Sequence, residues 1–182
     1  MMELRYEIVG PTHRDYNRAK SLFLHAFPPQ ERPPFEALFS WKDKGLTEFL
    51  NIYDGQTFLG FVHLVHYKDL LYLFFFALNE ENRNKGYGSK ILRELRDRYE
   101  GNRLYLLAEE VNPKYEDNAN RKRREAFYTR NGLINSRALI VEYGVPYELY
   151  YAGQEVSKKE HFALMRELLG EKAFSIYYKN VE

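Results

Sequence analysis

Residues 71–89 read LYLFFFALNEENRNKGYGS, an apolar run followed by a polar loop that contains two glycines. The run from Leu71 to Leu78 is apolar at every position, which predicts a strand buried on both faces of a sheet. Residues 89–99 then place apolar side chains at helical spacing, with charged side chains between them. We therefore expect a buried strand, a glycine-containing loop and an amphipathic helix, in that order.

The loop Arg83–Ser89 has the composition of an anion site. Glycines allow the backbone to turn with its N–H groups inward and leave room for a ligand. The start of the following helix adds unpaired donors and a partial positive charge, which suits a pyrophosphate. Arg83 and Lys85 add full charges, although a helix that merely begins with glycines would look the same. The loop matches neither the P-loop nor the dinucleotide fingerprint.

The remaining elements follow from apolar alternation, helical spacing and turn residues. We expect strands at residues 4–8, 49–53, 58–67, 104–108, 134–143 and 146–152, and a last extended piece at 174–178. We expect helices at about residues 15–27, from Pro33 through Trp41, at 119–130, and after the capping box that begins at Ser157. Asp54-Gly55 predicts a hairpin with positive φ at both positions. Residues 71–108 form a β-α-β unit with parallel strands, and the whole chain, residues 1–182, is expected to be one domain.

Composition limits the class of protein. With 27 basic and 26 acidic residues the net charge is +1, which argues against a dedicated nucleic-acid binder. The absence of cysteine excludes disulfides and thiolate metal sites, and no apolar run approaches membrane-spanning length. His63 and His66 would point to opposite faces of a strand, so we expect no metal. No signal peptide is evident at the N-terminus, and we expect a cytoplasmic protein without a membrane partner.

Two motifs, in this order and spacing, resemble a known family. Arg83-x-x-Gly86-x-Gly88 resembles the coenzyme A loop of the GCN5-related N-acetyltransferases, the GNAT superfamily. The sequence FYTRNGL at residues 127–133 is similar to a later motif of that family. The order of strands and helices also matches from residue 4 to about residue 152. The resemblance implies an α/β fold with a mixed, mostly antiparallel sheet of six to seven strands, splayed between the fourth and fifth strands.

The same resemblance implies acetyl-CoA as co-substrate and transfer of its acetyl group to an amine. The alternative is a module that binds acetyl-CoA without turnover. Backbone groups of three residues would pair with the pantetheine arm, namely Phe76, Ala77 and Leu78. Backbone N–H groups of seven residues would hold the pyrophosphate, namely Arg83, Asn84, Lys85, Gly86, Tyr87, Gly88 and Ser89.

The resemblance also implies a general acid, Tyr128, near the coenzyme sulfur; the alternative is an aromatic core residue. The base is sought among carboxylates. Glu109 and Glu110 follow a buried strand and point to opposite faces, so only one of them would serve, and we expect Glu109. Both could instead be solvated loop residues. Glu31 lies in a loop similar to one in bacterial relatives, where it would bind a cationic acceptor, act as base, or stay exposed.

The family pattern is not matched everywhere. Arg121 and Arg124 stand where relatives often carry Asn and Ala. The run Arg121-Lys122-Arg123-Arg124 would contact coenzyme phosphates or only solvate a helix face. Tyr143 and Tyr147 are expected to line the site of the acceptor, a small-molecule or peptide amine. A homodimer is among the assemblies compatible with the sequence. Without cysteine, no acetyl-cysteine can form, so direct attack within a ternary complex is expected.

Overall fold

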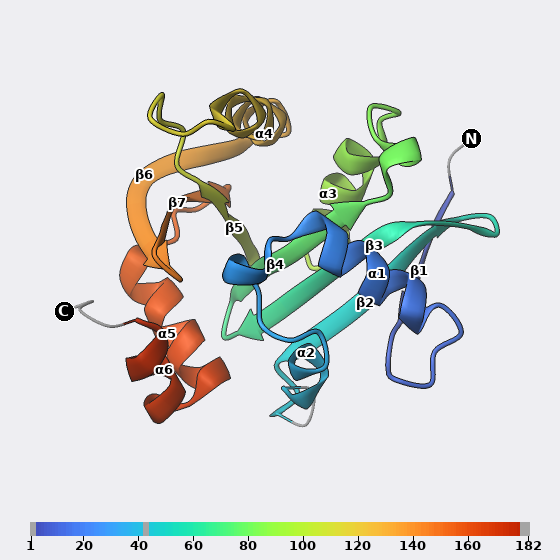
Figure 1. Ribbon diagram of the computed structural model, residues 1–182, viewed down its shortest axis with the longest axis horizontal. Helices are drawn as coiled ribbons and strands as arrows, with labels where there is room; N and C mark the ends of the chain where they lie inside the picture. Colours follow the sequence, from blue (N-terminus) through green and yellow to red (C-terminus); the bar gives the residue numbers. More distant parts are fainter. Residues whose placement is uncertain (1–2, 42–43, 179–182) are drawn as a thin grey trace. The chain divides into compact units, whose positions relative to one another are not determined.

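The computed structural model describes residues 3–41 and 44–178. Seven strands form one sheet in the order β1-β2-β3-β4-β5-β7-β6 (Figure 1). The strands are β1 (Leu4–Ile8), β2 (Thr47–Asp54), β3 (Thr57–Tyr67), β4 (Leu70–Leu78), β5 (Arg103–Glu109), β6 (Leu133–Glu142) and β7 (Val145–Ala152). The helices are α1 (Tyr16–Ala26), α2 (Ala37–Ser40), α3 (Tyr87–Arg98), α4 (Asn118–Arg130), α5 (Lys158–Leu169) and α6 (Glu171–Tyr177).

The expected fold class is confirmed. The pairs β1–β2, β2–β3, β5–β7 and β6–β7 are antiparallel, whereas β4 and β5 are parallel. The parallel pair follows from the connection through α3. A crossover helix brings the chain back to the end of the sheet at which the first strand began, so the second strand runs in the same direction. Its ladder is short, since Leu70–Tyr72 pair with Arg103–Tyr105 and the described ladder ends there. A short ladder is what the expected splay between the fourth and fifth strands requires.

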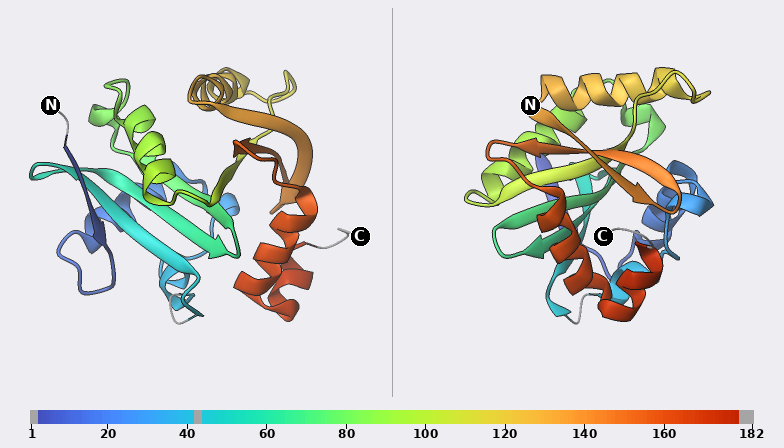
Figure 2. Two further views of the ribbon diagram at one scale, coloured as in Figure 1. Left: turned by 180° about the vertical axis from the view of Figure 1, so that it is seen from behind. Right: turned by 90° about the vertical axis from the view of Figure 1, so that its left-hand side faces the viewer.

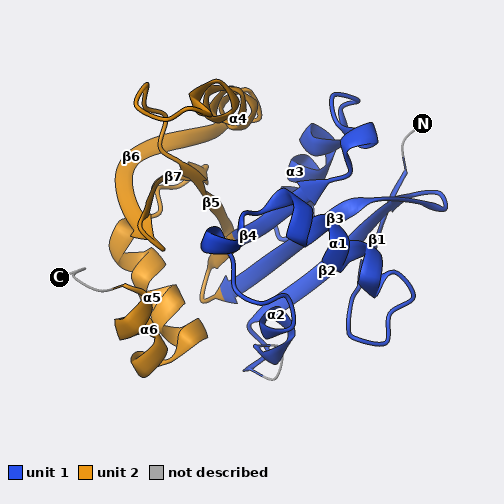
Figure 3. Ribbon diagram, in the orientation of Figure 1, with its two compact units in different colours: residues 1–66, 73–100 blue, residues 67–72, 101–182 orange. Residues whose placement is uncertain are grey.

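The chain divides into two compact units (Figure 3). One unit holds residues 1–66 and 73–100, and the other holds residues 67–72 and 101–182. Strand β4 contributes residues to both units. The single domain expected from the sequence therefore stays a prediction, and the two units are described separately below.

The first unit is built around aromatic side chains. Helix α1 buries Ala19, Leu22 and Phe23 on one face, as its helical spacing predicts. The ring of Phe23 meets that of Phe75 edge to face, with centroids 5.0 Å apart. Burying a side chain of this size contributes about 1.5–3 kcal/mol to the stability of the unit.

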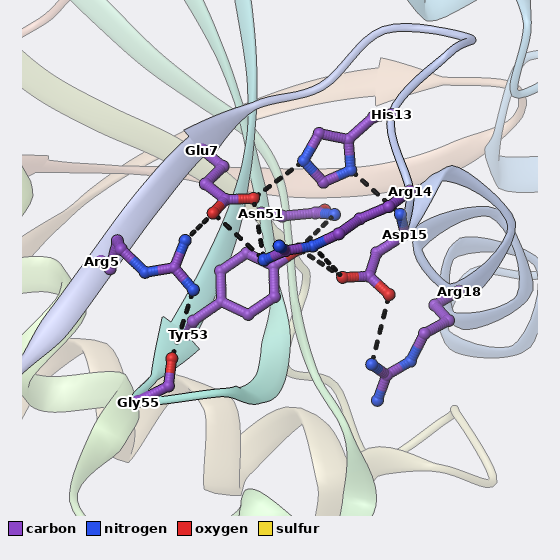
Figure 4. A network of polar contacts seen from close by, with 9 residues as sticks. All are labelled: Arg5, Glu7, His13, Arg14, Asp15, Arg18, Asn51, Tyr53 and Gly55. Atoms are coloured by element: carbon purple, nitrogen blue, oxygen red, sulfur yellow. Dashed lines mark hydrogen bonds and ion pairs between the residues drawn. The ribbon is translucent and has the colours of Figure 1, made fainter.

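A polar network connects strand β1 to the start of α1 (Figure 4). His13 Nδ1 accepts a hydrogen bond from the Asp15 N–H, so its Nε2 donates to Glu7 at 2.9 Å. The Asp15 carboxylate accepts from the Tyr53 hydroxyl at 2.7 Å and from Arg18 at 3.3 Å. Burial opposes ionisation of Asp15, but these donors outweigh it and lower its pKa. The network therefore links β1, β2 and the residues that precede α1.

Two details of this unit differ from the sequence expectation. The second helix is only Ala37–Ser40, so it begins after Pro33 and Pro34 instead of carrying them in its first turn, and it ends before Trp41. In the β2–β3 hairpin Asp54 still pairs with Thr57, so only Gly55 has positive φ, at 58°. The expectation of positive φ at both Asp54 and Gly55 is wrong.

In the second unit, β5, β7 and β6 lie beside α4, α5 and α6. The predicted capping box is confirmed, because the Ser157 side chain accepts from the Glu160 N–H and the Glu160 side chain accepts from the Ser157 N–H. Helices α5 and α6 lie side by side (Figure 2). No helix in the described part of the chain is both long and apolar enough to cross a membrane.

The extended piece expected at residues 174–178 is wrong, because residues 174–177 belong to α6 and Tyr178 is its C-cap. A strand would place Phe174, Ile176 and Tyr178 on one face. In the structure Phe174 and Tyr178 are buried together, one helical turn apart, while Ile176 is 62 % exposed. Packing of Phe174 and Tyr178 against Phe162 of α5 selects the helix.

Candidate active site

The predicted anion loop lies in the first unit, between β4 and α3. Asn84 and Gly86 have positive φ, at 60° and 86°, and Gly86 is the residue before the helix. Helix α3 begins at Tyr87, two residues earlier than expected, and its first hydrogen bond runs from the Lys90 N–H to the Gly86 carbonyl at 3.1 Å. Glycine suits position 86 because other residues are strained in the left-handed region.

The backbone donors of this loop are available. Within residues 3–41 and 44–178, the N–H groups from Asn84 to Ser89 donate no hydrogen bond. They lie at the positive end of a helix of 12 residues, where anions are stabilised. Lys85 is exposed, and Arg83 donates from Nε to the Leu78 carbonyl at 3.2 Å. The local geometry is that of an anion site.

Tyr87 joins this loop to the β2–β3 hairpin. Its hydroxyl donates to Asp54 Oδ2 at 2.7 Å, and this hydrogen bond raises the pKa of Tyr87. The hydroxyl therefore stays protonated at neutral pH and holds the first turn of α3 against the end of β2. No sequence motif indicated this contact, because the two residues are 33 positions apart.

The end of β4 carries the three residues expected to pair with the coenzyme arm. Phe76 and Leu78 are half-buried and Ala77 is buried. Strand β3 approaches this end closely at Gly60, where an added Cβ would lie 2.0 Å from the Ala77 carbonyl oxygen. Only glycine allows this approach, which places β3 directly behind Ala77.

Tyr128, the expected acid, lies on α4 in the second unit. Its ring contacts Phe127 and Tyr150, with centroids 5.3 Å and 5.7 Å away. Burial raises its pKa, Arg124 opposes the rise and Glu109 adds to it. Among the described residues no hydrogen bond reaches the Tyr128 hydroxyl.

The two expected base candidates have different partners. Glu109 is 12 % exposed and forms ion pairs with Arg121, at 3.5 Å, and with Arg124. Glu110 accepts from the Tyr115 hydroxyl at 3.1 Å and pairs with Lys114. For Glu110 burial favours the neutral acid, but hydrogen bonds outweigh it and lower the pKa.

Arg121 is a structural residue of α4 as well as a partner of Glu109. Its side chain is 8 % exposed and stacks on Tyr115, with the guanidinium carbon 3.9 Å from the ring centroid. It also donates to Asp117 at 2.8 Å and to the Glu110 carbonyl at 3.1 Å. Lys122 and Arg123 are exposed. Arg121 therefore ties α4 to the end of β5.

A buried polar cluster in the second unit was not indicated by the sequence. Glu142 of β6 accepts hydrogen bonds from Tyr178 and from His161 Nε2, the latter at 3.2 Å. His161 Nδ1 lies 3.0 Å from the Tyr105 hydroxyl. Tyr143, one of the residues expected to line the acceptor site, follows Glu142 directly. The contacting residues come from four elements, so no local pattern could have revealed the cluster.

The other expected site residues are placed as follows. Glu31 ends the 3-10 turn Pro29–Glu31 in the first unit and is half-buried. Tyr147 is half-buried on β7 of the second unit. Among residues 3–41 and 44–178, no group of three or more His, Cys, Asp or Glu side chains could hold a metal ion.

Comparisons with known proteins agree with the fold. The Acetyltransferase (GNAT) family matches residues 13–132. No match was found among curated proteins. One similar solved structure, described as a GNAT-family acetyltransferase from Bacteroides thetaiotaomicron, is 24 % identical, with a TM-score of 0.74 over 93 % of this chain and 98 % of that chain.

Two further structures share the fold at lower identity. The ribosomal-protein-S18-alanine N-acetyltransferase from Escherichia coli is 16 % identical, with a TM-score of 0.62 over 86 % of this chain and 97 % of that one. A GNAT acetyltransferase from Elizabethkingia anophelis with acetyl-CoA bound is 11 % identical, with a TM-score of 0.55 over 83 % and 98 %. Because the family match spans more than half of the residues and includes the anion loop, this chain belongs to the GNAT acetyltransferase family.

Proposed function

We propose that the protein is an N-acetyltransferase that transfers the acetyl group of acetyl-CoA to a primary amine by direct attack in a ternary complex. The observation that carries this proposal is the set of unpaired N–H groups from Asn84 to Ser89 at the start of α3. These donors match a diphosphate, which acetyl-CoA contains. Solved relatives of the same fold include one with acetyl-CoA bound.

Each step of the transfer is assigned a group. The neutral amine attacks the thioester carbon, the carbonyl oxygen becomes an oxyanion, and the carbon–sulfur bond then breaks. Tyr128 donates its hydroxyl proton to the departing thiolate, which fits a hydroxyl without a described hydrogen-bond partner; its raised pKa keeps it protonated at neutral pH. Backbone groups of Phe76, Ala77 and Leu78 orient the pantetheine arm. The absence of cysteine leaves direct attack as the simplest route.

The base is proposed to be Glu109, with Glu110 and Glu31 as the alternatives. The ion pairs of Glu109 with Arg121 and Arg124 favour its ionised form, which can accept a proton but holds it weakly. A separate role for Glu109 would be to hold α4 and thereby Tyr128. Replacing Glu109, Glu110 and Glu31 by Gln, one at a time, distinguishes a base from a residue that only positions α4. Loss of the base removes the acidic limb of the pH dependence of kcat/KM, whereas loss of a positioning residue does not.

The acceptor and the setting also belong to the proposal. A relative of the same fold acts on the alanine of ribosomal protein S18, so a peptide amine is one class of acceptor, beside small amines. We place Tyr143 and Tyr147 at the acceptor. We also propose that the protein is cytoplasmic and that it forms a homodimer.

Tyr128→Phe tests the assignment of the acid. We expect kcat for acetyl transfer to fall by about 10²- to 10⁴-fold, because the ring is kept and only the proton is lost. The affinity for acetyl-CoA, measured by calorimetry, should be unchanged. Tyr151→Phe, a half-buried tyrosine of β7, is the matched control. Equal kcat in the two variants would remove Tyr128 as the acid.

The alternative function is a module that binds acetyl-CoA without turnover. Release of free thiol that depends on an added amine acceptor distinguishes an enzyme from such a module. An enzyme releases CoA faster when an amine library is added, and the acetylated amine appears in equal amount. A protein that binds acetyl-CoA tightly, yet releases no thiol with any amine, would be the module instead.

A further inference from the structure

Glu142 is a buried carboxylate whose partners among the described residues include no lysine or arginine. It is 6 % exposed, and its hydrogen-bond donors are the Tyr178 hydroxyl and the His161 imidazole. Within residues 3–41 and 44–178 no lysine or arginine forms an ion pair with it. By contrast, Glu148 of β7 is equally buried but pairs with Arg137 at 3.4 Å.

A buried charge of this kind needs compensation. Removing a carboxylate from water is costly, and buried charges in proteins are normally paired. The hydroxyl and imidazole donors reduce the cost, but they leave a net negative charge unless His161 holds an extra proton. A cation supplied by a ligand would provide the missing partner.

Two tyrosines, Tyr143 and Tyr177, lie close to Glu142. Tyr143 is 42 % exposed and its ring meets that of Tyr177 with centroids 4.3 Å apart at 67°. Tyr177 is half-buried, and burial followed by the nearby Glu142 carboxylate raises its pKa. Tyrosine faces attract cations, and rings gathered beside a carboxylate form the kind of cage that binds ammonium groups. These rings would stay protonated and keep their affinity for a cation at neutral pH.

We propose that Glu142, Tyr143 and Tyr177 form a binding site for a cationic nitrogen of the acetyl acceptor, a statement that rests on the proposed function. We call these three residues the tyrosine–carboxylate site. The nitrogen that attacks the thioester must be neutral, whereas a nitrogen held against Glu142 stays charged. The nitrogen bound here is therefore a second one, and the acceptor class is a diamine or a larger polybasic amine.

The test compares 1,4-diaminobutane with 1-butylamine as acceptors. Wild type should prefer the diamine in kcat/KM, and Glu142→Gln should reduce that preference by roughly 10-fold or more, the usual loss when a charged hydrogen-bond partner is removed. The loss should appear in KM rather than in kcat. Glutamine keeps the shape and the acceptor oxygen for Tyr178 and His161. Glu148→Gln is the matched control and should keep the preference.

A second variant covers the case in which Glu142→Gln does not fold. Tyr143→Leu replaces an exposed ring and should reduce the preference for the diamine several-fold, because cation–π contacts at exposed sites contribute about 0.5–1 kcal/mol. An unchanged ratio of diamine to monoamine kcat/KM in both variants would overturn the site. So would diamine binding, measured by calorimetry, that is as tight in Glu142→Gln as in wild type.

Calorimetry also separates this proposal from the proposed function. If no amine is acetylated but 1,4-diaminobutane binds wild type and not Glu142→Gln, the site stands and the enzymatic function fails. If amines are acetylated with no dependence on Glu142 or Tyr143, the function stands and the site fails.

Discussion

The backbone of Gly86 has φ 86° and ψ −8°, in the left-handed region. This conformation changes the direction of the chain immediately before α3 begins at Tyr87, so it also sets the direction of the neighbouring peptide N–H groups. An L-residue with a Cβ loses about 1–2 kcal/mol there, because its side chain approaches the following carbonyl oxygen. One residue thus controls both the local stability of the loop and the direction of its donors.

Gly86→Ala is expected to weaken acetyl-CoA binding by about 5- to 30-fold, the factor that corresponds to that strain of about 1–2 kcal/mol if binding must restore the native loop. The measurement is the dissociation constant by calorimetry. Gly101→Ala has a similar φ, 92°, at the end of α3, so it carries similar strain away from the loop. A comparable loss of affinity in both variants would show that the loop geometry is not responsible.

Helix α5 is held at its first turn by charges from the rest of the second unit. Arg103 donates to Glu160 at 2.7 Å and to Asp69 at 2.6 Å, so it links β5, the β3–β4 turn and α5. The hydrogen bond from Arg103, helped by the Ser157 N–H, lowers the pKa of Glu160 from 4.5 to about 2. Because the folded pKa lies below the ordinary value, this bond stabilises the folded state above pH 4.5 and is lost as the pH falls towards 2.

Glu160→Gln is accordingly expected to be less stable than wild type at neutral pH, with a difference that shrinks between pH 4.5 and 2. Urea unfolding across that range measures it. Glu116→Gln, at an exposed position before α4, serves as the control and should follow wild type at every pH. A difference that stays constant down to pH 2 would contradict the role of the Arg103 bond.

Strands β3 and β4 approach each other most closely at Gly60. A methyl group there would lie 2.0 Å from the Ala77 oxygen, so one strand has to move. Gly60→Ala is expected to destabilise the protein by about 1–3 kcal/mol or more, as overpacked cores do. Thermal unfolding checks this. Gly10→Ala, with no atom within 4 Å of the added Cβ, should change the unfolding temperature little. Similar unfolding temperatures for the two variants would refute the close approach.

Binding of acetyl-CoA should stabilise the folded protein as a whole, because the unfolded chain has no loop to hold the diphosphate. At a concentration 100 times the dissociation constant the gain is about 2.7 kcal/mol, which raises Tm by about 5–10 °C for a chain of this size. Differential scanning fluorimetry measures the shift. Pantetheine, which lacks the diphosphate, should produce little shift at the same concentration. Equal shifts with both ligands would place the main contacts elsewhere.

Local patterns predicted most of the strands and helices. Ile91, Leu92 and Leu95 are buried as their spacing predicts, and Ser157 caps α5 as its motif predicts. Patterns of this kind succeed because they depend on residues within one or two turns of each other. The segment at 174–178 failed for the same reason, since its alternation fits a strand and its contacts with Phe162 lie outside the segment.

Only long-range packing determined the partners of the buried polar and charged side chains. Glu142 and His161 are 19 residues apart, and Tyr105 and His161 are 56 apart, so nothing in either neighbourhood marks them as partners. The partners of Glu109 likewise follow from the packing of α4 on β5, which brings Arg121 and Arg124 to it. The type and spacing of residues specify the helix or strand to which each belongs and the face on which it lies. The tertiary fold specifies which charged side chains from distant parts of the sequence lie next to it.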